Sequence, residues 1–162
     1  MTKTIAYIPG VLAEAFGHDA LPQILKAAGA DLKWEAVPWT SAHSEPAAHP
    51  ILNGSDAILM AYQRPALGDP PTIVTLREQF KCFANVRPLC GVPGLNARFD
   101  DIDLLVVRES TEDIYAQLEH ESIPGVYESL KVTTRGACER IARFAFETAQ
   151  RQKRKKVTIV HK

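Results

Sequence analysis

The chain has 162 residues, of which 46% are hydrophobic, and its 19 Lys and Arg residues balance its 19 Asp and Glu residues. This length and composition are typical of a globular protein with one sizeable core, and the zero net charge gives no general attraction for nucleic acid. No apolar run approaches the roughly 20 residues that cross a bilayer, and the chain enters a strand pattern directly, without a signal-peptide pattern. We therefore expect a cytoplasmic location and no nucleic-acid or membrane partner.

The first third of the chain alternates between strand and helix patterns. Strands are predicted at residues 4–9, 32–37 and 56–62, and apolar residues at helical spacing indicate a helix over 21–28. Gly29 is expected to end this helix. The order strand, helix, strand predicts a βαβ unit, and hence an α/β fold with a parallel-type sheet and flanking helices.

The rest of the chain continues this mixture. The segment 104–107 consists of four consecutive aliphatic residues, which is typical of a strand covered on both faces. A long amphipathic helix is indicated over 135–152 by the 3.6-residue period of its apolar side chains. The remaining predicted elements are a helix over 73–80 and extended segments at 84–89, 130–134 and 157–160. The three cysteines have no CxxC spacing and are expected to be free thiols: Cys82, Cys90 and Cys138.

Three arginines adjoin these elements, in the segments LREQF (Arg77), ANVRPL (Arg87) and LVVRES (Arg108). Strands of α/β proteins carry ligand groups at their carboxyl ends, where Arg108 is expected. Three converging guanidinium groups would bind a di- or tricarboxylate, because each pairs with a carboxylate through two parallel hydrogen bonds and keeps its charge. Each arginine taken singly has a structural alternative, and for Arg108 this is a surface ion pair with Glu109.

The order of four longer segments is more specific. LREQFKCFANVRP, FDDIDLLVVRESTEDIYAQLEH, PGVYESLKVTTRGACERIARFAFE and KKVTIVHK together resemble the isocitrate/isopropylmalate dehydrogenase family of β-decarboxylating dehydrogenases, and are most similar to the NAD-type isocitrate dehydrogenases. The resemblance implies that residues 1–100 form the N-terminal part of the large α/β domain. Residues 101–162 would then form the first part of the small, dimerisation domain.

The resemblance also implies an active site. Arg77, Arg87 and Arg108 would bind the carboxylates of a 2-hydroxy tricarboxylate, and Tyr115 would be the acid that reprotonates the enol after carbon dioxide leaves. Lys162 would help to deprotonate the hydroxyl in the neighbouring subunit's site. The implied cofactors are NAD or NADP with Mg²⁺ or Mn²⁺, and the implied partner is a second copy or a longer homologue. Hydride loss needs a base and the enolate needs a proton donor, so these residue types suit the chemistry.

Some positions depart from the family pattern. The first turn reads IPGVLAEAF, without the glycines that let the backbone approach a cofactor, and Pro71 and Ile73 replace polar substrate contacts. The family's metal-binding aspartates and adenosine-binding loop would follow Lys162, so we expect a chain that is incomplete relative to the family. Two hypotheses stay open: a segment of an isocitrate dehydrogenase-like enzyme, or a non-catalytic truncated paralogue or regulatory subunit. The carboxylates of Glu109, Glu112 and Asp113 are expected to order a loop.

Overall fold

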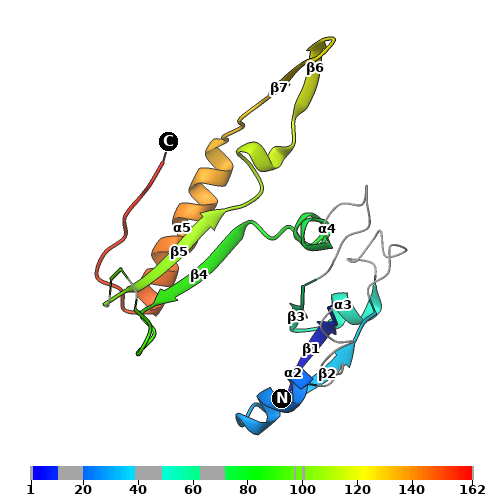
Figure 1. Ribbon diagram of the computed structural model, residues 1–162, viewed down its shortest axis with the longest axis vertical. Helices are drawn as coiled ribbons and strands as arrows, with labels where there is room; N and C mark the ends of the chain where they lie inside the picture. Colours follow the sequence, from blue (N-terminus) through cyan, green and yellow to red (C-terminus); the bar gives the residue numbers. More distant parts are fainter. Residues whose placement is uncertain are drawn as a thin grey trace. The chain divides into compact units, whose positions relative to one another are not determined.

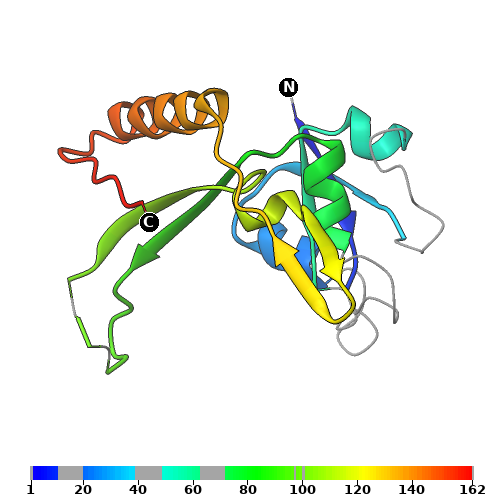
Figure 2. The same cartoon turned by 90° about the horizontal axis from the view of Figure 1, so that it is seen from above.

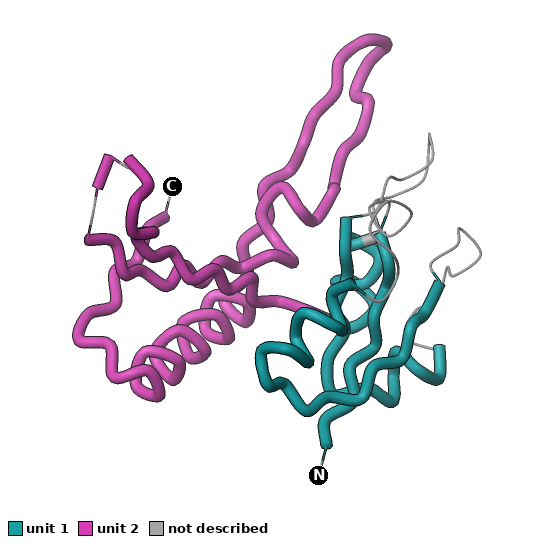
Figure 3. The backbone as a smooth tube through the Cα atoms, turned by 60° about the horizontal axis from the view of Figure 1, so that its bottom comes forward, with its two compact units in different colours: residues 1–81 teal, residues 82–162 magenta. Residues whose placement is uncertain are grey.

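The computed structural model describes residues 2–10, 20–38, 49–62, 72–96, 98–99 and 101–161. The chain divides into two compact units, Met1–Lys81 and Cys82–Lys162, which Figure 3 shows in teal and magenta. Each unit is described by itself. In the described part of the chain, no helix has both the length and the apolar character that a bilayer crossing requires.

The first unit is built on a parallel sheet in which β1 (Lys3–Ile8) lies between β2 (Leu32–Ala36) and β3 (Ala57–Met60) (Figure 1). Helix α2 (Ala20–Ala27) connects β1 to β2, so the predicted βαβ unit is confirmed. The short helix α3 (Pro50–Gly54) was not expected from the sequence.

Helix α2 ends as the sequence predicts. Gly29 has a φ of 87°, a left-handed conformation that glycine adopts without a steric penalty. The backbone N–H of Gly29 donates to the carbonyl of Lys26, and the N–H of Ala30 donates to the carbonyl of Leu25. This pair of bonds is a Schellman motif, which satisfies carbonyls that the end of the helix leaves unpaired.

The hydrophobic core of the first unit lies where the sheet meets the helices. Its most buried members come from β1, α3, helix α4 (Thr72–Gln79) and the end of β2: Ala6, Ile8, Val37, Leu52 and Leu76. At the end of β1 the backbone packs so closely that a Cβ atom on Gly10 would collide with the carbonyl oxygen of Tyr62. A residue larger than glycine cannot occupy this position without moving the chain that follows β3.

The second unit has antiparallel strands. Strands β4 (Ala84–Cys90) and β5 (Asp103–Glu109) form a long pair, and β6 (Glu119–Ile123) and β7 (Val126–Ser129) form a separate hairpin (Figures 1 and 2). Helix α5 (Arg135–Arg151) packs against β5, and the rings of Phe83 and Phe144 meet edge to face with their centroids 5.7 Å apart. Helix α5 therefore covers one face of the β4–β5 pair.

Several predictions for the second unit were wrong. The strand at 104–108 is not covered on both faces, because Leu104 and Val106 on one face are 57% and 42% exposed. In the described chain β5 also has only one neighbouring strand, β4. Residues 130–134 contribute a single bridge, Asp113 to Val132, and the hairpin at 119–129 was missed. Residues 157–160 form no strand, because an extended segment needs a hydrogen-bonded neighbour and no described strand pairs with it. The cysteines are free, as predicted.

Candidate functional site

Two of the predicted arginines lie on the open face of the β4–β5 pair, which is the face that helix α5 does not cover. In the antiparallel register Asn85 lies opposite Arg108, and Arg87 lies opposite Val106. Residues directly opposite one another share a face, as do residues two apart on one strand, so Arg87 and Arg108 project from the same side of the pair. They occupy diagonal positions, and diagonal neighbours in antiparallel sheets are ~7–8 Å apart, with their Cβ atoms somewhat closer. Both side chains are exposed.

Asn85 completes this cationic face. Its side-chain oxygen accepts a hydrogen bond from Nε of Arg87 at 3.2 Å, and it stands opposite Arg108 in the register. The contact restrains the guanidinium of Arg87 while leaving its two terminal nitrogens available. Sequence reasoning missed Asn85, although its spacing of two from Arg87 in a predicted strand was a signal that it shares a face with that arginine.

Tyr115 lies against Arg108. The guanidinium carbon of Arg108 is 4.9 Å from the centroid of the Tyr115 ring, which is within the ~6 Å range of a cation–π contact. Tyr115 lies in the 3-10 turn Ile114–Ala116, which is capped by Asp113 in a backbone conformation with a φ of 66°. Seven residues apart in sequence, the predicted carboxylate-binding arginine and the predicted acid therefore meet in space.

The adjacent carboxylate, Glu109, points to the other face and has different partners. Its oxygens accept hydrogen bonds from the backbone N–H groups of Thr111 and Glu112, both at 2.8 Å, from the Thr111 hydroxyl at 2.6 Å and from Arg140 at 3.2 Å. Partial burial raises the pKa of this carboxyl, but these hydrogen bonds together outweigh burial and hold the pKa below its ordinary value. The suggested Arg108–Glu109 ion pair is wrong, because Glu109 pairs with Arg140 of helix α5.

Glu112 and Asp113 order the loop, as the sequence predicts. Glu112 accepts hydrogen bonds from the backbone N–H and the hydroxyl of Thr134, at 2.7 and 2.6 Å. Thr134 is the N-cap of α5 and accepts a hydrogen bond from the N–H of Ala137 at 3.2 Å. Asp113 accepts a hydrogen bond from the N–H of Ile114 at 2.9 Å and lies 3.7 Å from the Lys131 ammonium. These carboxylates fasten the segment after β5 to the start of α5 and the residues before it.

The other predicted site residues are distributed differently. Arg77 is half-buried in the last turn of α4 and belongs to the first unit, so the convergence of all three arginines stays a prediction. Lys162 lies outside the described residues, as do Pro71 and most of the first turn, residues 11–16. Ile73 is 37% exposed on α4.

The described residues do not fit a magnesium or manganese site. Across the ranges that the structure describes, no three His, Cys, Asp or Glu side chains lie close enough to hold a metal ion. Asp103, the first residue of β5, is paired with Arg154, whose Nη1 atom lies 2.7 Å from Oδ1 of Asp103. A hard cation needs several oxygen ligands, so no chemical step is assigned to a metal bound by these residues.

A parallel βαβ unit and an antiparallel strand pair covered by a helix place the chain in the class of mixed α/β proteins. The chain belongs to the isocitrate/isopropylmalate dehydrogenase family, since the model of that family matches residues 27–162. A crystal structure of isocitrate dehydrogenase from Methylococcus capsulatus superposes with a TM-score of 0.80 and 32% identity, over 100% of this chain and 51% of that one.

Curated relatives agree with this assignment. The chain is 55% identical over 89 residues to isocitrate dehydrogenase [NAD] subunit 1, mitochondrial, of Saccharomyces cerevisiae, which is 55% of this chain and 25% of that protein. It is 33% identical to the probable isocitrate dehydrogenase [NAD] subunit alpha, mitochondrial, of Drosophila melanogaster. This alignment covers 99% of this chain and 45% of that protein. It is 52% identical over 89 residues, 55% of this chain and 24% of the relative, to isocitrate dehydrogenase [NAD] regulatory subunit 2, mitochondrial, of Arabidopsis thaliana. The chain thus spans between a quarter and about half of the length of these relatives.

These names contradict one prediction. The relatives are mitochondrial subunits, so the expectation of a cytoplasmic location is wrong. The composition and hydropathy of a folded enzyme do not distinguish one aqueous compartment from another, and the expectation rested on those features and on the first residues of the sequence.

Proposed function

We propose that the chain is a segment of an isocitrate dehydrogenase-like, NAD-dependent enzyme that oxidises and decarboxylates a 2-hydroxy tricarboxylate. The observation that carries the proposal is the placement of Arg87 and Arg108 on one open sheet face, with Tyr115 against Arg108. Residues 1–100 would contribute to the large domain and residues 101–162 to the small, dimerisation domain. The family relationship supports this assignment.

Arg87 and Arg108 would bind substrate carboxylates. Each guanidinium offers a planar pair of donors that matches the two oxygens of a carboxylate, and the diagonal spacing suits carboxylates on neighbouring carbons of one ligand. The family resemblance implies that Arg77 would supply a third contact to the same ligand. Within strands β4 and β5, no carboxylate projects from the face that carries Arg87 and Arg108, which favours binding of an anion there.

Tyr115 would act as an acid. In the proposed reaction Lys162 of a neighbouring subunit would take the proton of the substrate hydroxyl, and the carbon that bears this hydroxyl would lose its hydrogen as a hydride. A bound NAD would supply the hydride acceptor. The bond that joins the β-carboxylate to the substrate would then break, and the carboxylate carbon would leave as carbon dioxide. The electron pair of the broken bond would form an enolate. The Tyr115 hydroxyl would donate a proton to the enolate carbon. The guanidinium of Arg108 beside the ring would hold the phenol near the substrate that the same arginine binds.

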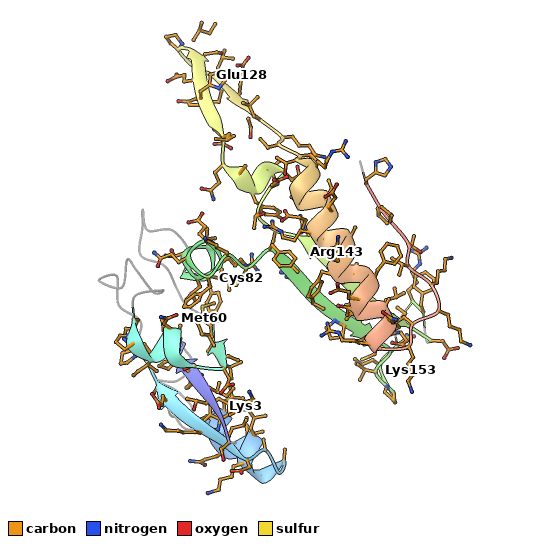
Figure 4. All side chains as sticks on the ribbon, turned by 180° about the vertical axis from the view of Figure 1, so that it is seen from behind. Lys3, Met60, Cys82, Glu128, Arg143 and Lys153 are labelled. Carbon is orange, nitrogen blue, oxygen red and sulfur yellow. The ribbon has the colours of Figure 1, made fainter. Side chains whose placement is uncertain are left out.

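Calorimetry tests the arginine pair. Isocitrate and citrate are expected to bind the chain more tightly than acetate, and Arg108→Lys is expected to weaken tricarboxylate binding about tenfold or more, because one ammonium cannot reproduce a two-point contact. The matched control is Arg143→Lys, on helix α5 at the position labelled in Figure 4, which is exposed and outside the proposed site. Equal affinity for wild type and Arg108→Lys, or no preference for a tricarboxylate, would refute the proposed pocket.

The partner is proposed to be a second copy or a longer homologue, since Lys162 would act in a neighbouring subunit. Light scattering at tens of micromolar is expected to give a mass above that of one chain, or to do so after a full-length relative is added. A mass of 17.9 kDa for the chain alone, together with no species in the mixture heavier than those each protein forms by itself, would contradict this part of the proposal.

A non-catalytic or regulatory subunit is the alternative. It is favoured by the apolar Ile73 where the family has a polar substrate contact, and by the 52% identity to a relative named as a regulatory subunit. The two functions differ in one measurement, the isocitrate-dependent reduction of NAD or NADP in the presence of Mg²⁺ or Mn²⁺. The chain alone is expected to give no turnover. A change in the turnover of an added catalytic relative, compared with that relative by itself, would favour the regulatory function.

A further inference from the structure

Arg140 of helix α5 joins three groups at the end of β5. Its Nη2 atom is 3.2 Å from Oε1 of Glu109 and 3.0 Å from Oγ1 of Thr111, and its guanidinium carbon is 4.6 Å from the centroid of the Phe83 ring. Phe83 directly precedes β4, so Arg140 contacts the starting end of one strand and the finishing end of its antiparallel neighbour.

The contacts of Arg140 continue into the backbone of the loop. The Thr111 hydroxyl accepts from Arg140 and donates to Glu109 at 2.6 Å, so this hydroxyl has a fixed orientation. The other oxygen of Glu109 accepts from the N–H groups of Thr111 and Glu112. Two consecutive backbone amides are therefore held by one carboxylate, which is held in turn by Arg140.

This arrangement lies three residues before Tyr115. The path from Glu112 to the Tyr115 ring passes only through Asp113 and the start of the 3-10 turn, and Glu112 is itself bonded to Thr134. The loop that presents Tyr115 is thus fixed to helix α5 at two points, one through Arg140 and one through Thr134. Neither point lies on the open face that carries Arg87 and Arg108.

We infer that Arg140 is a positioning residue, which acts through Glu109 and Thr111 to keep the Tyr115 ring against Arg108. Its consequence for catalysis rests on the proposed function, whereas its effect on the loop does not. Arg140 contacts no group of the proposed substrate pocket, so its role is to limit the conformations of the loop. A loop free to leave Arg108 would carry the proposed acid away from the substrate.

The test uses the whole chain and needs no substrate. The variant is Arg140→Gln, and the matched control is Arg135→Gln on the same helix. Arg135 is a suitable control because its side chain is 90% exposed and its Nη1 atom makes a long contact, of 3.9 Å, with Oε1 of Glu139. The readouts are hydrogen exchange of the Thr111 and Glu112 amides, and the ¹⁹F NMR signal of Tyr115 in protein labelled with 3-fluorotyrosine. Tyr115→Phe identifies that signal among the four tyrosines.

Arg140→Gln is expected to speed exchange at the two amides about tenfold, which corresponds to about 1.4 kcal/mol, and to move the Tyr115 signal towards that of an unfolded chain. Amides in the middle of α5 and in β1 are expected to exchange as in wild type. Arg140→Lys keeps a charged donor for Glu109 and is expected to recover at least half of the lost protection. Arg135→Gln is expected to change neither readout.

Three results would overturn the inference. Unchanged exchange and an unchanged Tyr115 signal in Arg140→Gln would mean that Arg140 does not hold the loop. Loss of protection throughout α5 would mean that its role is to pack the helix, and no recovery in Arg140→Lys would mean that donation to Glu109 is not the cause. Failure of the proposed function is a separate result, seen as tricarboxylate binding that does not depend on Arg108 while the loop readouts still respond to Arg140.

Discussion

In Met1–Lys81 the central strand β1 is hydrogen-bonded on both sides and supplies buried side chains to a core. Among the described residues of Cys82–Lys162, by contrast, strands β4 and β5 pair only with each other. All five members of the buried core cluster lie in the first unit. Among the described residues of the second unit only Ala137 and Thr148 are buried. The first unit is stabilised mainly by apolar burial, and the second relies more on hydrogen bonds and ion pairs.

This difference matters because the loop with Tyr115 belongs to the second unit. A residue that is not packed into a core is positioned by directional contacts, and here these are the hydrogen bonds of Glu109 and Glu112. Such contacts depend on charge and pH, whereas apolar burial does not. Substitutions in the two units are therefore expected to differ both in size and in pH dependence.

The largest effect is expected from Ile8→Ala in the core of the first unit. Ile8 has no exposed surface, so the substitution leaves a cavity and is expected to lower the free energy of unfolding by about 2–5 kcal/mol. Urea unfolding followed by the fluorescence of Trp34, whose ring centroid is 6.4 Å from that of Tyr7, measures it. The matched control is Ile24→Ala, at a position that is 64% exposed.

The same truncation in the second unit sharpens the contrast. Val106→Ala removes apolar atoms from a strand residue that is 42% exposed, and is expected to cost less than about 1 kcal/mol by circular dichroism. If Val106→Ala proved as costly as Ile8→Ala, the open face of β5 would be covered in solution and the comparison between the units would not hold.

A loss between those of Ile8→Ala and Val106→Ala is expected from Thr134→Ala, which removes the N-cap of α5 and a hydroxyl donor to Glu112. Loss of a cap costs about 0.5–2 kcal/mol, and the broken contact to Glu112 places the expected value in the upper half of that range. Urea unfolding followed by circular dichroism measures it. Thr133→Ala, at the exposed neighbouring position, is the control and is expected to have little effect.

Glu109→Gln tests the pH dependence. The folded-state pKa of Glu109 is below its ordinary value of 4.5, so its charge stabilises the fold fully above pH 4.5, and this stability is lost as the pH falls through the lower, folded-state pKa. Wild type is expected to exceed the variant by about 1 kcal/mol at pH 7, and the gap should narrow below pH 4.5. Unfolding curves of both proteins between pH 7 and 3 measure it, and a constant gap would contradict the assignment.

The smallest effect is expected on the hairpin, from Glu128→Gln. Glu128, labelled in Figure 4, lies opposite His120 in the β6–β7 register, with its Oε2 atom 2.8 Å from Nε2 and both side chains more than half exposed. An exposed pair of this kind is worth less than about 1 kcal/mol. With His120 protonated, any difference between wild type and variant should disappear in 1 M salt, where charges are screened within ~3 Å. A larger, salt-independent loss would show that the pair is buried in solution.

Local patterns predicted the first unit and helix α5 well, because the alternation of apolar residues and Gly29 reports directly on strands, helix and helix end. The proximity of Arg108 and Tyr115 followed from a strand and a short loop in one motif. The hairpin was missed because EHESI and VYES place no apolar face towards a core. The pairing of Glu109 with Arg140 joins residues 31 apart in sequence and depends on how α5 packs, which no local pattern contains.

The alternation of Arg108 and Glu109 across β5 has a consequence for insertions and deletions. Because successive side chains point to opposite faces, one residue added within β5 before Arg108 would turn its guanidinium towards α5 and bring the Glu109 carboxylate to the open face. The face would then repel the anions it is proposed to attract, and Arg140 would meet another cation. Insertions and deletions are therefore expected to be tolerated in the connection between β4 and β5, and to disrupt the proposed site when they fall inside β5.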